Sequence, residues 1–179
     1  MRVNFYYFLN LLLLLIITVI LGAIQTTLWP QLFGGLPAPI LWLVLIAYLG
    51  LYRRFWESIF LVYACAACLA PYTAMSIGFY MLLLLILVAL VQFAKTRIFW
   101  PGPGYFLIAV ASLGVAYHVL HISMSYFFEA VPMTSLEILS RLIQILLTPM
   151  TAIPLFFIFQ LIDRISHYDT LTEVGGGRL

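Results

Sequence analysis

The sequence predicts an all-α integral membrane protein with six transmembrane helices in one compact bundle. Composition is the first observation: 65% of the 179 residues are hydrophobic and 8% are charged, whereas a soluble domain has about 45–50% apolar and about 25% charged residues. The second observation is that the apolar runs are long and uninterrupted, unlike the alternating strands of an outer-membrane barrel. Together they exclude a cytosolic enzyme, a disordered protein, a secreted disulfide scaffold and a nucleic-acid binder.

The first apolar run extends from Phe5 to Ile24 and follows a single basic residue, Arg2. At about 1.5 Å per residue, a run of this length reaches roughly 30 Å, which is the thickness of a hydrocarbon core. A signal peptide would have only about 7–15 apolar residues and a cleavage site with small side chains. We therefore expect a retained transmembrane helix over 5–24.

Five further apolar runs follow, separated by short stretches that hold prolines, glycines or charges. A loop containing Pro30 ends the first helix, Arg53 and Arg54 separate the second run from the third, and Pro71 ends or kinks the third. We expect the remaining helices at about 37–52, 55–72, 77–94, 105–128 and 139–162, followed by a polar tail over 163–179.

Basic residues are distributed unevenly between the two sides of the predicted bundle. Six spans put both termini on one side, and seven of the eight basic residues fall there, whereas only Arg141 falls on the other side. Because cytoplasmic loops carry an excess of lysine and arginine, we expect both termini to be cytoplasmic. The loops on that side hold four basic residues that we expect to anchor the bundle at the cytoplasmic surface: Arg53, Arg54, Lys95 and Arg97.

Cys65 and Cys68 form a C-x-x-C pattern inside the third predicted span. A quinone-coupled thiol oxidoreductase would need a second cysteine pair, and this chain has two cysteines in total. The nearest charge, Glu57, is eight residues away, although reactive thiolates need a positive or wet environment. We interpret both cysteines as small packing residues that let neighbouring helices approach closely, with redox chemistry as the alternative.

A polar stripe lies along one face of the fifth predicted span. At about 100° per residue, its members share an arc of about 80°, and they are His118, His121, Ser125 and Glu129. Such a set can bind a metal or relay protons, but a membrane metal site usually needs ligands from another helix, and the third histidine, His167, lies in the tail. We expect the stripe to pack against another helix or a partner, without a metal or other cofactor.

A matching stripe lies on the sixth predicted span, again within an arc of about 80°, and consists of Arg141, Gln144, Thr148 and Thr151. An intramembrane arginine is costly, so it should face protein or water. Glu129 and Glu137 are the expected counter-ions, and contact of Arg141 with a solute is the alternative. Since neither charge is tolerated facing lipid, we expect the two stripes to face each other or one protein-lined cleft.

The sequence contains no motif of a catalytic site. It lacks a nucleophile elbow, an H-E-x-x-H zinc motif, a P-loop and paired carboxylates within a span. We therefore expect a protein without enzymatic activity.

Three short stretches carry a resemblance to a known family. They are IQTTLWPQL at 24–32, LVLIAYLGLYRR at 43–54 and SIGFY at 76–80. Together with the size and the six-span pattern, they make the chain similar to the MreD family of bacterial rod shape-determining proteins. The chain departs from the family at Pro37-Ala-Pro39, where Pro-Asp is frequent, and at 67–71, where a glycine-rich helix often ends in an acidic residue.

The resemblance implies a fold like the substrate-binding subunits of energy-coupling-factor vitamin transporters. It also implies a non-enzymatic scaffold in the bacterial inner membrane, within the cell-wall elongation complex. The implied partner is an MreC-like single-pass protein, with MreB, RodA and its transpeptidase as further candidates in the same machinery. The alternative function is that of a solute-binding membrane subunit of a vitamin or metal transporter.

Overall fold

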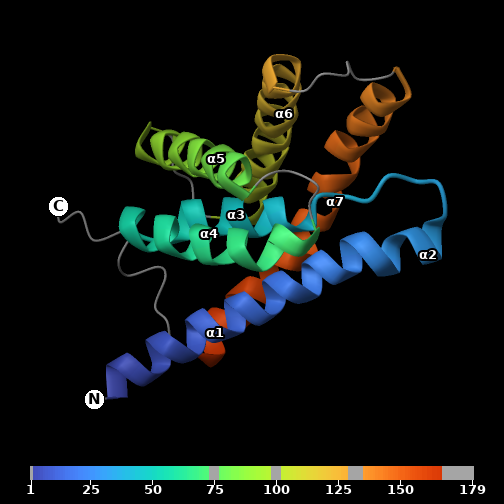
Figure 1. Ribbon diagram of the computed structural model, residues 1–179. Coiled ribbons are helices and arrows are strands. Elements are labelled where there is room, and N and C mark those ends of the chain that lie inside the picture. Colours follow the sequence, from blue (N-terminus) through green and yellow to red (C-terminus); the bar gives the residue numbers. More distant parts are fainter. Residues whose placement is uncertain (1, 73–76, 98–101, 129–134, 167–179) are drawn as a thin grey trace.

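The computed structural model describes residues 2–72, 77–97, 102–128 and 135–166. These residues are helical apart from short connections, and no strand occurs among them. The helices are α1 (Arg2–Ala23), the π-helical turn η1 (Ile24–Leu28), α2 (Trp29–Phe33), α3 (Leu41–Tyr52), α4 (Phe55–Leu69), the 3₁₀ turn η2 (Ala70–Tyr72), α5 (Ile77–Arg97), α6 (Pro103–Phe128) and α7 (Ser135–Ile165) (Figure 1).

Five helical segments are long and apolar enough to cross a membrane. They cover residues 6–33, 55–72, 77–97, 103–123 and 136–165. Large apolar side chains are exposed on their outward faces, among them Phe8, Phe60, Phe93 and Leu146. A soluble monomer rarely exposes this much large apolar surface. The prediction of an all-helical membrane protein is therefore confirmed.

The short helix α3 is the centre of the bundle. All of its residues are buried, and it packs against α1, α4, α5, α6 and α7. Because no face of α3 is exposed, the sequence of this helix is apolar on all sides rather than amphipathic. The other helices surround it and present their outer faces away from the core (Figure 1).

The expected span over 37–52 is helical only from Leu41 onward. Pro37 and Pro39 lack a backbone donor and disfavour helical geometry in the residues before them, so 37–40 is non-helical. The helix of 12 residues is about 18 Å long, too short to cross a hydrocarbon core of roughly 30 Å. The four preceding non-helical residues extend the segment by at most about 13 Å.

Side chains from two other elements satisfy the backbone where this non-helical segment meets α3. The amide of Ile40 donates to Oγ1 of Thr148 on α7 at 3.0 Å, and the amide of Leu41 donates to Oε1 of Gln25 on η1 at 3.1 Å. Irregular backbone at membrane depth is tolerated only when protein or water supplies such partners. Thr148 and Gln25 therefore fix the entry of α3.

The helices alternate in direction, which gives the bundle two distinct ends. One end, the Arg53 end, holds Arg53 together with Asn10 from early α1 and Asp163 from late α7. The other, the Arg141 end, holds the start of α7 with Arg141 and the end of α1 with Gly22. The two ends carry different polar sites, and each joins helices that are distant in the sequence.

Candidate functional site

A cavity of about 400 Å³ lies at the Arg141 end of the bundle. Its polar wall comes from η1, α6 and α7, and includes Gln25, His121, Glu137, Ser140, Arg141 and Gln144. Its aromatic wall comes from α3, η2, α5 and α6, and consists of Trp42, Tyr72, Tyr80 and Tyr117. Polar groups that converge in a concave, partly aromatic space are the usual features of a ligand site.

Arg141 and His121 join the two sequence-predicted stripes at this cavity. Nη1 of Arg141 lies 2.9 Å from Nδ1 of His121. A guanidinium can only donate, so Nδ1 accepts, and the imidazole is neutral with its proton on Nε2. The sequence indicated Glu129 or Glu137 as the partner of the arginine. Glu129 lies outside the described residues, whereas Glu137 lines the same cavity.

The other stripe residues have separate positions. His118 is buried, and neither of its ring nitrogens has a hydrogen-bond partner in the described part of the chain. Gln144 lines the cavity, and Thr148 binds the amide of Ile40. Thr151 donates to the carbonyl of Thr148 at 2.8 Å. Ser125 belongs to α6, but its side chain lies outside the described residues.

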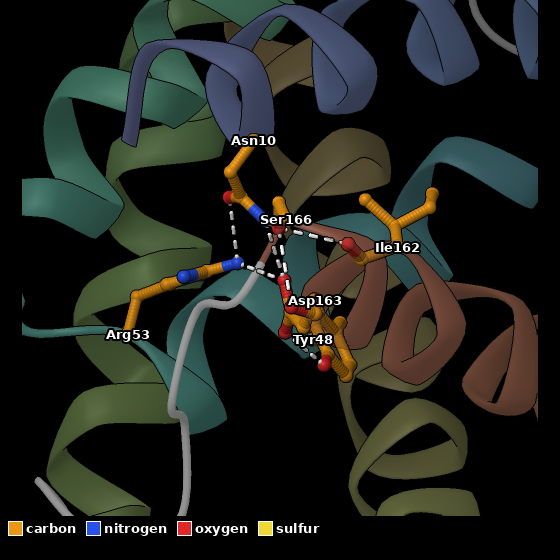
Figure 2. Close-up of polar contacts among 6 residues, drawn as sticks. All are labelled: Asn10, Tyr48, Arg53, Ile162, Asp163 and Ser166. Carbon is orange, nitrogen blue, oxygen red and sulfur yellow. Dashed lines mark hydrogen bonds and ion pairs between the residues drawn. The ribbon is translucent and has the colours of Figure 1, made fainter. Parts of the chain in front are cut away.

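A second polar site is buried at the Arg53 end (Figure 2). Arg53 and Asp163 form an ion pair and are 1% and 3% exposed. Nη2 of Arg53 also donates to Oδ1 of Asn10 at 2.9 Å, and the Tyr48 hydroxyl donates to Oδ2 of Asp163 at 2.5 Å. Nδ2 of Asn10 lies within hydrogen-bond distance of Oδ1 of Asp163 and of Oγ of Ser166. These five residues, the Arg53 cluster, connect α1, α3 and α7.

The local chain path explains why Arg53 points into the bundle. Helix α3 ends at Tyr52, and Arg53 adopts an extended conformation with φ −111° and ψ 164°. Its carbonyl accepts from Nζ of Lys95 at 2.9 Å and from Nε2 of Gln92 at 3.4 Å. Two residues of α5 therefore hold the turn between α3 and α4, and this turn directs the guanidinium inward.

The structure corrects the expected role of Arg53. We expected all four basic loop residues to anchor the bundle at the membrane surface, but Arg53 is buried and ion-paired. Lys95 is half-buried and binds the Arg53 carbonyl. Arg54 and Arg97 are exposed, and the guanidinium of Arg97 lies 5.7 Å from the ring centroid of Phe93.

Sequence reasoning also missed Asn10 and Asp163. Asp163 was placed at the start of the tail, but α7 continues to Ile165 and its carboxylate is buried. Apart from two tyrosines, the polar residues in the first apolar run between Phe5 and Ile24 are Asn10 and Thr18. An amide side chain within a membrane helix is costly unless it has a partner, and that is the signal that points to Asn10.

The two cysteines are free thiols in the structure. Cys65 is fully buried, with its sulfur 3.3 Å from Oγ1 of Thr18 on α1, and Cys68 is partly buried. Among the residues that the structure describes, no three histidine, cysteine or acidic side chains form a group that could hold a metal ion. The cysteines lie in the helix α4, which packs against α1 and α5.

The fold, the outward apolar faces and the buried polar sites define the chain as a multi-helix integral membrane protein. Comparison of the chain with models of protein families, with curated proteins and with solved structures finds no match.

Proposed function

We propose that this chain is a non-enzymatic scaffold of the bacterial cell-wall elongation complex, similar to MreD. In this role it lies in the inner membrane, binds an MreC-like single-pass protein, and helps to couple MreB filaments to peptidoglycan synthesis by RodA and its transpeptidase. It performs no reaction of its own. The helices that surround α3 provide the apolar surfaces on which lipid and partner helices pack.

The observation that carries this proposal is where the family-like stretches lie in the fold. The stretch at 43–54 forms nearly all of the buried helix α3 and ends with the ion-paired Arg53. The stretch at 24–32 forms η1 and most of α2, and its Gln25 caps α3. The resemblance therefore falls on residues that position the core.

Charge placement supports an orientation with both termini cytoplasmic. Four basic residues lie in or next to helix ends at the Arg53 end, and they are Arg54, Lys95, Arg97 and Arg164. Arg141 lies at the opposite end. An excess of basic residues marks the cytoplasmic side of a membrane protein. In this orientation the cavity lies on the periplasmic side.

Purification of the tagged full chain in mild detergent, followed by identification of co-purifying proteins, tests the proposed function. A single-pass protein with a large periplasmic domain is the expected partner. Recovery of a pair of ATPase subunits in its place would contradict the scaffold role. Arg54→Ala changes an exposed residue beside the buried Arg53. If this variant no longer recovers the partner, the partner contacts the surface around Arg54.

The second candidate function, a solute-binding subunit of a vitamin or metal transporter, is favoured by the cavity. Its polar side chains from η1, α6 and α7 converge on one space, as a solute site requires. A fold like that of the energy-coupling-factor substrate-binding subunits would suit this function. Co-purification of ATPase subunits, rather than of a single-pass protein, would favour it.

A further inference from the structure

The cavity at the Arg141 end has the size of a small-molecule site. Its volume of about 400 Å³ lies within the roughly 300–1,000 Å³ of ligand pockets. A cavity of about 150 Å³ holds benzene, so in proportion this one has room for roughly 16 non-hydrogen atoms. A molecule with one or two fused rings and a polar substituent has this size.

The hydrogen-bonding groups on its polar wall favour an anionic group. Arg141 uses one donor on His121, and a guanidinium has five, in a planar arrangement that matches a carboxylate. Oε1 of Gln25 accepts from Leu41, so its amide NH₂ is the group that can donate into the cavity. Glu137 also lines the cavity, but its side chain is exposed and its charge is screened by water, whereas Arg141 is half-buried. The charge of Arg141 and the amide donor of Gln25 are therefore suited to binding a carboxylate.

The aromatic side chains of the cavity favour a planar body. The ring of Trp42 contacts Tyr80 and Tyr117 edge-on, with centroid distances of 5.6 and 5.2 Å and interplanar angles of 79° and 85°. All three side chains are buried and line the cavity. Because they hold one another in place, they form a rigid aromatic wall, and aromatic rings pack well on such a wall in offset or edge-on arrangements.

The cavity lies near a helix end, so a ligand need not cross the bilayer to enter. Helix α7 begins at Ser135, and Arg141 lies about 9 Å along it. Glu137 and Ser140, which are on the same first turns, are exposed and line the cavity. Among the described residues, the cavity therefore extends to the end of the bundle where α7 begins.

We propose that this cavity binds a small aromatic carboxylate, whose carboxylate group contacts Arg141 and Gln25 and whose ring packs against Trp42, Tyr80 and Tyr117. This inference goes beyond a scaffold role, and its test does not depend on the partner that co-purifies. A ligand site in a scaffold would let the level of a small molecule influence assembly through the packing of α3, α6 and α7, which line the cavity.

Binding of 2-naphthoate to the purified full chain in a neutral maltoside detergent tests the proposal. Trp42 lines the site, so quenching of tryptophan fluorescence and calorimetry both provide a signal. The wild-type chain should bind 2-naphthoate and should bind the uncharged 2-naphthamide at least about tenfold more weakly, since a charge-assisted hydrogen bond is lost. This comparison needs no variant. Equal affinity for the two compounds, or no binding of 2-naphthoate, would overturn the proposal.

A matched pair of variants then tests the position of the site. Arg141→Gln keeps hydrogen-bonding groups and removes the charge, and it should weaken 2-naphthoate binding by about 10- to 100-fold. Arg164→Gln removes an exposed charge near the Arg53 end and should leave binding unchanged. Thermal melting of both variants verifies that they are folded. A folded Arg141→Gln protein with wild-type affinity would show that the carboxylate binds elsewhere.

Discussion

The guanidinium of Arg53 pairs with the carboxylate of Asp163, although 110 residues separate them in the sequence. One residue follows α3 and the other belongs to the last turn of α7. Asn10 from α1 bonds to both of them. A buried ion pair contributes little net stability compared with apolar packing, but the loss of one partner leaves an uncompensated charge. The pair and Asn10 therefore connect three helices at one end of the bundle.

The first prediction concerns this pair. Arg53→Ala should destabilise the bundle by about 3–5 kcal/mol, because the Asp163 carboxylate would stay buried without its cation. Thermal melting in detergent and the yield of folded protein in the membrane measure the effect. Arg54→Ala, at the neighbouring exposed position, should change stability by less than about 0.5 kcal/mol.

A double variant distinguishes a lost pair from a lost side chain. Arg53→Met combined with Asp163→Leu removes both charges, so it should be more stable than either single variant. If the two single effects simply add, the ion pair is not the reason for the loss of stability in Arg53→Ala.

The sequence predicted the order of the helices because each apolar run is bounded by charges, prolines or glycines. It did not predict that α3 begins only at Leu41. The apolar run starts at Pro37, and hydropathy alone does not show that Pro37 and Pro39 keep the first residues of this run non-helical. The 3.6-residue period grouped Arg141 and Gln144 on one face, and both line the cavity. The contact between Arg141 and His121 depends on how α6 and α7 pack, which the pattern within one helix does not show.

The Arg53 cluster illustrates the same limit more strongly. Asn10, Arg53 and Asp163 are far apart in the sequence and lie on different elements. No local pattern connects them, because the contact depends on three helices meeting at one end of the bundle. Only the cost of an amide side chain in an apolar run marks Asn10 in advance.

The second prediction concerns the entry of α3. Thr148→Val removes the hydroxyl that accepts from the Ile40 amide at 3.0 Å and should cost about 1–3 kcal/mol, because a buried donor is left without a partner. Thr148→Ser keeps the hydroxyl and should retain most of the stability. Equal melting temperatures for the valine and serine variants would show that the hydrogen bond is unimportant.

The third prediction concerns the close approach of α3 and α5. A Cβ at Gly50 would lie 2.7 Å from Cγ1 and 3.0 Å from Cβ of Val91. Gly50→Ala should therefore destabilise the protein by about 1–3 kcal/mol through overpacking. Gly114 on α6 is the control, since its added Cβ would lie 3.9 Å from Leu43 and alanine favours helix. Thermal melting should show a loss for the first variant only.

The fourth prediction is that both cysteines are structural. Replacement of Cys65 and Cys68 by alanine should leave assembly and function intact, because alanine keeps a small side chain where α4 packs against α1. Partner recovery in detergent measures the effect. Loss of function together with a thiol that cycles between oxidation states in cells would favour the redox alternative.

The last prediction separates six membrane crossings from five. The five long helices alone would put the two termini on opposite sides, whereas a crossing by 37–52 puts them on the same side. The contacts of Asn10 on early α1 with Asp163 in the last turn of α7 and with Ser166 directly after it favour six crossings. We therefore expect a reporter fused after Leu179 to be cytoplasmic and one inserted near Gly34 to be periplasmic. A periplasmic signal at Leu179 would mean that the segment of α3 enters the membrane without crossing it.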